Sequence, residues 1–241
     1  MLTKSKAIVL RTVRYGDKRI IVDMFTEQYG RLSFATTVGS SARSRQKKLY
    51  YQPLAILEVV FDYRPSLQVQ RLNDVRIWWP STSLHFDSFK MSLVFFLSEF
   101  LYYVTRGEQE NRPLFAYIVN SLAWLDSVSK SFSNFHLVFM MRLSRFVGFL
   151  PNLDDYAEGD CFDLQEGAFC HLPPSHSNYL KPDEAARIAL LMRLRYETMH
   201  LCAMSRNERN RCTEVIVEFY RLHVPGFSEM KSLAVVQDLF V

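Results

Sequence analysis

The spacing of apolar residues changes at Trp78-Trp79-Pro80, and this change constrains the fold more than any other feature of the chain. Before it, short runs rich in β-branched and aromatic residues are separated by turns, as in successive strands. After it, apolar residues recur at steps of three and four, which is the period of an amphipathic helix. The sequence therefore predicts an α+β protein, with a β module over residues 1–80 and a helical domain over residues 81–241.

Five strand-like segments make up the β module. They cover residues 4–14, 19–26, 32–38, 54–63 and 67–77. Strands spaced roughly ten residues apart, with one long loop between the third and the fourth, favour a small closed barrel of the OB type over an open sheet. In barrels of this type nucleic acid crosses one face and is held by long loops.

The charge of the chain is concentrated in this module. Residues 1–80 hold 14 Lys and Arg against 6 Asp and Glu, a net charge of +8, whereas residues 81–241 hold 15 against 19, a net charge of −4. A basic module joined to a slightly acidic one indicates that the first part meets a polyanion and the second meets something else.

The long loop from Gly39 to Lys48 is the most basic segment. Its cations are Arg43, Arg45, Lys47 and Lys48, and the aromatic pair Tyr50 and Tyr51 follows at once. Cations beside aromatic rings suit phosphates and stacked bases. The alternative is a solvated turn that keeps a sheet edge soluble. We expect the loop to bind nucleic acid together with the cations of the first three strands and their turns, Arg11, Arg14, Lys18, Arg19 and Arg31, although barrels also need outward charges for solubility.

The helical domain is predicted to contain helices over residues 84–106, 112–128, 135–149, 183–199 and 207–223, and an apolar tail from residue 232. Residues 151–182 lose helical periodicity and predict an irregular insert with a small hairpin. Arg142 and Arg145 interrupt an apolar helical run. Arginines beside Phe and Met suit an acidic, apolar peptide tail, or they form the solvent side of that helix.

No cofactor, metal or catalytic group is expected. Cys161, Cys170, Cys202 and Cys212 are scattered without a C-x-x-C pair, which argues against zinc and fits a reducing cytosol. There is no G-x-S-x-G, P-loop or G-x-G-x-x-G motif, so an enzyme is unsupported. No apolar run approaches the about 18–20 residues of a membrane span, and no secretory signal is recognised, so we expect a cytoplasmic protein without a membrane partner.

The order of several short motifs resembles the RecO family of bacterial recombination mediators. In the β module they are A-I-V-L-R-T at residues 7–12, D-M-F-T at 23–26, Y-G-R-L at 29–32 and Q-P-L at 52–54. In the helical domain they are R-L-S-R-F-V-G-F-L-P at 142–151, F-D-L-Q-E-G-A-F at 162–169 and Y-R-L-H at 220–223. The similarity extends over nearly the whole chain.

The resemblance implies an N-terminal OB fold, a helical C-terminal domain and a role in recombinational repair. RecO-like proteins bind single- and double-stranded DNA, anneal complementary strands, engage the acidic C-terminal tail of single-strand DNA-binding protein (SSB), and work with RecR to place RecA on coated DNA. Many members hold zinc on four cysteines in the irregular insert, where this chain has only Cys161 and Cys170. The competing hypothesis is a protein-only adaptor whose basic barrel binds an acidic partner.

Overall fold

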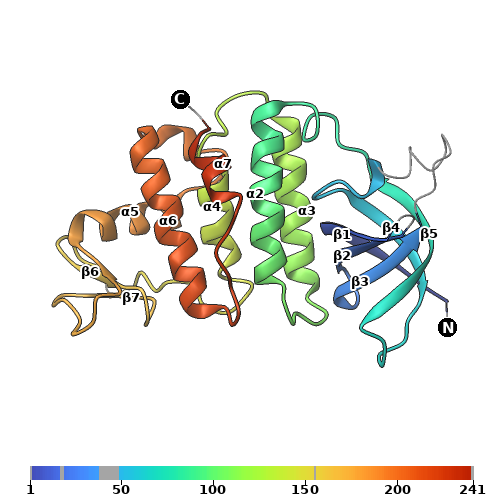
Figure 1. Cartoon of the computed structure of the whole chain (residues 1–241). Helices are drawn as coiled ribbons and strands as arrows, with labels where there is room; N and C mark the ends of the chain where they lie inside the picture. Colours follow the sequence, from blue (N-terminus) through green and yellow to red (C-terminus); the bar gives the residue numbers. More distant parts are fainter. Residues whose placement is uncertain (1, 17–18, 38–48, 155, 240–241) are drawn as a thin grey trace. The chain divides into compact units, whose positions relative to one another are not determined.

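The computed structural model describes residues 2–16, 19–37, 49–154 and 156–239. The chain divides into two compact units (Figure 1). The first holds residues 1–127 and 230–236, and the second holds residues 128–229 and 237–241. The boundary after residue 80 stays a prediction.

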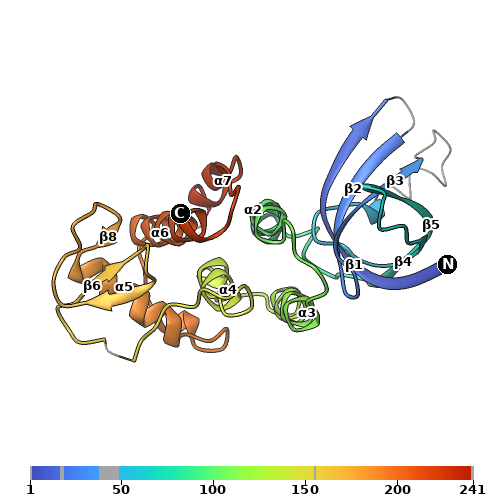
Figure 2. The ribbon, with the colours of Figure 1, turned by 90° about the horizontal axis from the view of Figure 1, so that it is seen from below.

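A closed barrel of five strands opens the first unit. The strands are β1 (Leu2–Tyr15), β2 (Arg19–Thr26), β3 (Gly30–Thr37), β4 (Ile56–Asp62) and β5 (Val69–Trp79). Their order is β1-β2-β3-β5-β4, and β4 closes the barrel by pairing with β1. Only the β3–β5 pair among these five strands is parallel. Figure 2 shows the strands curving round a common interior. The predicted OB-type barrel is therefore confirmed.

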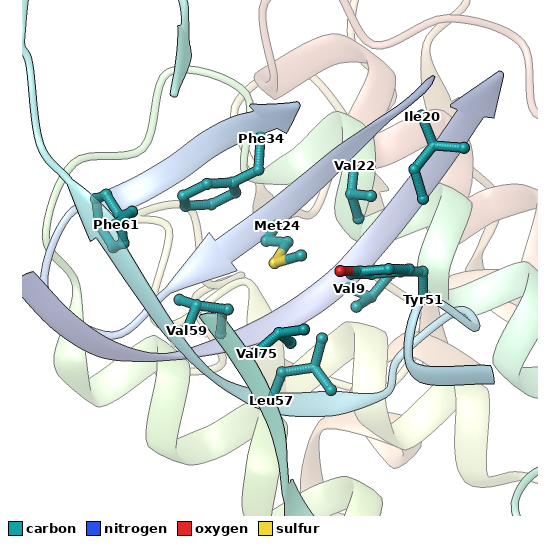
Figure 3. Close-up of a cluster of buried hydrophobic side chains, with 11 residues drawn as sticks. Val9, Ile20, Val22, Met24, Phe34, Tyr51, Leu57, Val59, Phe61 and Val75 are labelled. Carbon is teal, nitrogen blue, oxygen red and sulfur yellow. The ribbon is translucent and has the colours of Figure 1, made fainter. Parts of the chain in front are cut away.

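Alternate residues of the strands fill the barrel, because successive side chains of a strand point to opposite faces. Val9, Val22, Met24 and Phe34 converge there with residues of β4 and β5 (Figure 3). Tyr51 also belongs to this core and is only 5% exposed, and Thr12 donates a hydrogen bond to its carbonyl at 2.9 Å. Burial raises the pKa of its hydroxyl. Of the aromatic pair after the basic loop, Tyr51 is thus a core residue.

Two helices, α2 (Ser88–Val104) and α3 (Arg112–Ser127), lie side by side in the first unit (Figure 1, Figure 2). The turn before β3 packs against the loop that joins them. Gly30 has a φ of +65°, and a Cβ there would lie 2.1 Å from the Glu108 carbonyl oxygen. The Arg31 N–H donates to this oxygen at 3.1 Å. Only glycine permits both this φ and this approach.

The chain passes from β5 into α2 through a segment anchored on Asp126, near the end of α3. The Asp126 carboxylate accepts hydrogen bonds from the backbone N–H groups of Thr82, Ser83 and Leu84 at 2.9, 2.7 and 3.0 Å. The buried Lys90 donates to the Ser83 hydroxyl and to the Asp126 carbonyl. Asp87 then caps α2 by accepting from the N–H groups of residues 89 and 90. These bonds fix where the helix begins.

The second unit contains α4 (Phe135–Leu143), β6 (Cys161–Asp163), β7 (Ala168–Cys170), β8 (Tyr179–Leu180), α5 (Pro182–Arg193), the 3₁₀ turn η1 (Met199–Leu201) and α6 (Arg206–His223). The hairpin of the insert is confirmed, and β8 extends it into the sheet β7-β6-β8. Two helices are shorter than predicted, because α4 ends at Leu143 and α5 at Arg193. A capping box of Ser205 and Glu208 begins α6.

The predicted apolar tail forms the short helix α7 (Leu233–Gln237). Within the first unit, the Glu99 carboxylate of α2 accepts from the Lys231 N–H at 3.1 Å, and from the Ser232 N–H and hydroxyl at 2.8 and 2.5 Å. A carboxylate at this point satisfies N–H groups at the start of α7. Across the described ranges, no helix has the length and apolar character that crossing a bilayer requires.

Candidate nucleic-acid interface

The hairpin of β1 and β2 carries three exposed cations among those predicted to bind nucleic acid, Arg11, Arg14 and Arg19. A bulge between Val9 and Arg11 shifts the register, and every residue from 11 to 15 is exposed. Tyr15 lies opposite Arg19, and Arg14 opposite Ile20. Since side chains alternate along a strand, Arg14 and Arg19 lie on opposite faces of the hairpin. Together they place positive charge on both sides of it.

Arg11 and Arg31 meet on one aromatic side chain of α2, Tyr102. The Arg31 guanidinium carbon lies 3.9 Å from the centre of that ring, and the Arg11 guanidinium carbon lies 5.0 Å from it. Arg11 donates to the Tyr102 hydroxyl at 3.1 Å, and Arg31 donates to the Tyr102 carbonyl at 2.6 Å. That carbonyl lies in the last turn of α2, where the helix dipole favours a cation. Both arginines therefore fasten the helix to the barrel, and each keeps further N–H donors.

Lys18 and the basic-loop cations Arg43, Arg45, Lys47 and Lys48 lie outside the described residues. Their assignment to nucleic acid stays a prediction. The described chain resumes at Leu49, directly after the last of these cations.

Five cations were counted in the charge of the module but were not predicted as site residues, and Arg64, Arg71 and Arg76 are three of them. Arg71 of β5 is exposed and lies opposite Ala35 of β3. Arg64 pairs with Asp62 at 3.1 Å, and Arg76 pairs with Asp74 at 3.5 Å. The R-x-x-x-x-R spacing in a strand gives no motif, so only the pairing of β3 with β5 reveals that Arg71 extends the basic surface.

Comparison with known proteins gives a family match for both parts of the chain. The family model described as Recombination protein O N terminal matches residues 1–79, and the model described as Recombination protein O C terminal matches residues 85–234. This chain belongs to the RecO family of DNA repair proteins. It is 50% identical to the DNA repair protein RecO of Bacteroides fragilis over 241 residues and 49% identical to that of Phocaeicola vulgatus over 240, and these alignments cover both chains completely. The RecO protein of Flavobacterium psychrophilum is 31% identical over 242 residues, again across both chains.

The two arginines predicted to bind a peptide partner, Arg142 and Arg145, are not on one helical face. α4 ends at Leu143, so Arg142 lies in its last turn and Arg145 in the turn that follows. The half-buried Arg142 donates through Nε to the Leu194 carbonyl at 3.2 Å, whereas Arg145 is exposed. Arg142 thus holds the chain after α5, and Arg145 is the more accessible of the pair.

The irregular insert holds two of the four cysteines that a zinc site of the kind found in many family members would need. Cys161 and Cys170 lie directly opposite each other on β6 and β7, and all four cysteines are free thiols. The neighbouring histidines pair with carboxylates instead, His171 with Asp160 at 2.5 Å and His176 with Asp163 at 3.2 Å. Among the residues that the structure describes, no three His, Cys, Asp or Glu gather as metal ligands. Two opposed thiols do not fit a tetrahedral four-cysteine site.

Proposed function

We propose that this RecO family member is a non-enzymatic recombination mediator that binds single- and double-stranded DNA through its barrel and anneals complementary strands. In the same proposal it engages the SSB tail through its helical part and, with RecR, helps RecA to load on SSB-coated DNA. The observation that carries the proposal is the closed barrel, which lies in the segment that matches the N-terminal model of this DNA repair family. The excess positive charge of the chain lies in the same segment.

DNA binding is assigned first to the exposed Arg14 and Arg19 of the hairpin, to Lys18 and to the cations of the basic loop. Arg11 and Arg31 take a secondary part through the donors that do not contact Tyr102. Cations that neutralise phosphates release condensed counterions, so the affinity is expected to fall steeply with salt.

Annealing needs no covalent step. Two strands approach each other against the repulsion of their phosphates, and a cationic barrel surface lowers that repulsion. Removal of SSB needs contacts that compete with its own hold on the strand. The carboxylates of an acidic, apolar tail can accept hydrogen bonds from the exposed guanidinium of Arg145, and such charge-assisted bonds are among the stronger ones. The apolar residues of the tail can pack on apolar side chains beside it.

The test is a fluorescence-anisotropy titration of labelled single-stranded DNA at several salt concentrations. The variant carries Arg43→Ala, Arg45→Ala, Lys47→Ala and Lys48→Ala. We expect a loss of affinity of about tenfold or more, equivalent to about 1.4 kcal/mol, and a salt slope shallower by up to about 3, at roughly 0.7 per phosphate contact. A control with the same change in charge replaces four exposed cations of the second unit, Lys130, Lys181, Arg193 and Arg195.

Unchanged affinity in the basic-loop variant would contradict the assignment of that loop. Equal losses in the two variants would indicate a response to net charge alone. A shallow salt slope in the unmodified protein would favour the second candidate, a protein-only adaptor whose basic barrel binds an acidic partner. That candidate draws support from Arg11 and Arg31, which the packing of α2 already occupies in part.

A further inference from the structure

An apolar cavity opens at one end of the barrel, within the first unit. Its volume is about 270 Å³, and its walls come from the segment after the basic loop, from β4 and β5, and from the turn before α2. Pockets for drug-sized ligands begin at about 300 Å³, and this cavity is slightly smaller. Its volume therefore suits a single ring system better than a segment of peptide.

Large apolar side chains at its rim are exposed. Phe86 is 80% exposed, Leu49 61% and Ile77 48%. Ile77 lies opposite Leu57 and so points to the inner side of the barrel, yet it is half uncovered because the cavity lies beside it. A cluster of exposed apolar side chains around a cavity indicates a binding site, whereas single exposed apolar residues are common on any protein surface.

The two tryptophans that end β5 have different environments. Trp79 lines the cavity, whereas the ring of Trp78 lies under the Lys6 ammonium, 4.3 Å from the ring centre. Trp79 and Tyr50 therefore offer aromatic faces to an occupant of the cavity. Base stacking on such rings is the usual apolar contact of proteins with single strands.

The histidine of the cavity wall, His85, makes its hydrogen bonds within the protein. His85 Nε2 donates to the Pro53 carbonyl at 2.9 Å, because a carbonyl only accepts. Its Nδ1 is then the acceptor of the neutral ring, and the Ser81 hydroxyl donates to it at 2.9 Å. Both ring nitrogens of His85 are thus occupied, and most of the remaining lining is apolar, so shape and stacking are the main contacts that the cavity offers.

The positive charge of the barrel segment favours a nucleobase over a protein side chain as the occupant of the cavity. The cavity lies in the +8 segment, and its wall residues Leu49 and Tyr50 follow Lys47 and Lys48 directly in the sequence. A nucleic acid is a polyanion that also carries flat base rings, and their faces can stack on aromatic side chains. We propose that the cavity binds one unpaired nucleobase of single-stranded DNA. This proposal rests on the DNA binding proposed above. It adds a reason for the protein to distinguish single strands from duplex.

The experiment compares affinities for a single strand of about 16 nucleotides, the upper length that one OB fold covers, and for a duplex of the same length. The variant carries Phe86→Ala and Ile77→Ser. We expect its affinity for the single strand to fall about tenfold and its affinity for duplex to stay within about twofold, because only the unpaired base reaches the cavity. Phe95→Ala is the matched control, since Phe95 is a 48% exposed phenylalanine of the same unit that does not line the cavity.

Occupancy is followed separately in a protein with Trp78→Phe and Trp124→Phe, in which Trp79 is the remaining tryptophan. Single-stranded DNA is expected to quench its emission, and a strand with abasic positions is expected to quench it less. Equal losses for single strand and duplex, or no quenching, would overturn the cavity proposal, as would quenching by an acidic apolar peptide alone. Failure of the unmodified protein to bind either DNA would instead overturn the proposed function.

Discussion

The Arg31 guanidinium lies over the face of Tyr102, 3.9 Å from the ring centre, and donates to the carbonyl of the same residue at 2.6 Å. One side chain of the barrel thus holds both the ring and the backbone at the end of α2. This arrangement gives Arg31 a stabilising role that is distinct from any contact with DNA.

We predict that Arg31→Ala lowers the free energy of unfolding by about 2 kcal/mol, since a charged hydrogen bond and a cation–π contact are both lost. Its DNA affinity is expected to change less than that of Arg14→Ala. The exposed Arg14 should give the opposite result, with a roughly threefold loss of DNA affinity and stability within about 0.5 kcal/mol. Urea unfolding and anisotropy titrations measure the two quantities.

Tyr102→Phe is the matched control for Arg31→Ala. It keeps the ring and the carbonyl and removes only the hydroxyl that accepts from Arg11, so a loss below about 1 kcal/mol is expected. If Arg31→Ala left stability unchanged and weakened DNA binding, Arg31 would be a phosphate contact as the sequence analysis first supposed.

The Asp126 carboxylate is expected to make the free energy of unfolding depend on pH in the acidic range. Burial raises the pKa of its carboxyl, but the hydrogen bonds from Thr82, Ser83 and Leu84 outweigh burial and lower the pKa to about 2. The unfolded carboxyl titrates near 4, so its contribution is complete above about pH 4 and is lost as the pH falls toward 2. A shift of this size corresponds to about 2 kcal/mol.

Asp126→Asn is therefore expected to lower the free energy of unfolding by about 2 kcal/mol at pH 7 and to differ less from the unmodified protein at pH 3. Urea unfolding at both pH values measures this difference. Glu229→Gln, at an exposed position, is the control for loss of a carboxylate. A difference between the unmodified and Asp126→Asn proteins that stays constant with pH would show that packing, and not ionisation, explains the loss.

The barrel could be predicted from the sequence because its strands are short runs rich in β-branched and aromatic residues, about ten residues apart, and the first two turns contain Gly16 and Gly30. The end of α4 could not. The apolar run continues to Phe149, yet after Leu143 the N–H groups of Arg145 and Phe146 bond to carbonyls only three residues back, which closes tight turns and not a further α-helical turn. Periodicity records which residues are apolar and not where the backbone stops being helical.

The assignment of site residues shows the same limit. Arg11 and Arg31 have the exposure pattern and charge of DNA contacts, but their partner Tyr102 lies 91 and 71 positions further along the chain. No local pattern indicates such a pairing. The fifth strand was predicted to end at Ile77 and ends at Trp79, close to the prediction, whereas the cavity beside Trp79 becomes visible only in the folded structure.

Arg145 and Arg142 give a test of the partner site in the helical part. We predict that Arg145→Ala weakens binding of an SSB-tail peptide by roughly fivefold at unchanged stability, because one exposed charge contact is worth about 1 kcal/mol. Arg142→Ala is expected to destabilise the protein, since the Leu194 carbonyl loses its donor. Calorimetric titration of the peptide and thermal unfolding separate the two effects. Equal peptide affinity for the unmodified and Arg145→Ala proteins would place the tail elsewhere.

A second dependence of stability on pH, at less acidic values, is predicted from His136. It is fully buried in α4, and its Nε2 donates to the Thr213 hydroxyl at 3.0 Å, because that hydroxyl itself donates to the Arg209 carbonyl. Burial, and then the charge of Arg209, lower its pKa to about 3. The folded ring therefore stays neutral between about pH 6.5 and 3, where the unfolded ring takes up a proton.

Because the unfolded state binds more protons in this window, stability falls as the pH drops below about 6.5, by close to 1.4 kcal/mol per unit once the unfolded ring is mostly protonated. In the His136→Gln protein, the decrease in the free energy of unfolding between pH 6.5 and 5 is expected to be smaller by about 1.5 kcal/mol. Urea unfolding at the two values measures it, with the exposed His200→Gln as control. Identical pH profiles for the His136→Gln and unmodified proteins would mean that the ring takes up its proton over the same pH range in the folded and unfolded states, which its burial beside Arg209 opposes.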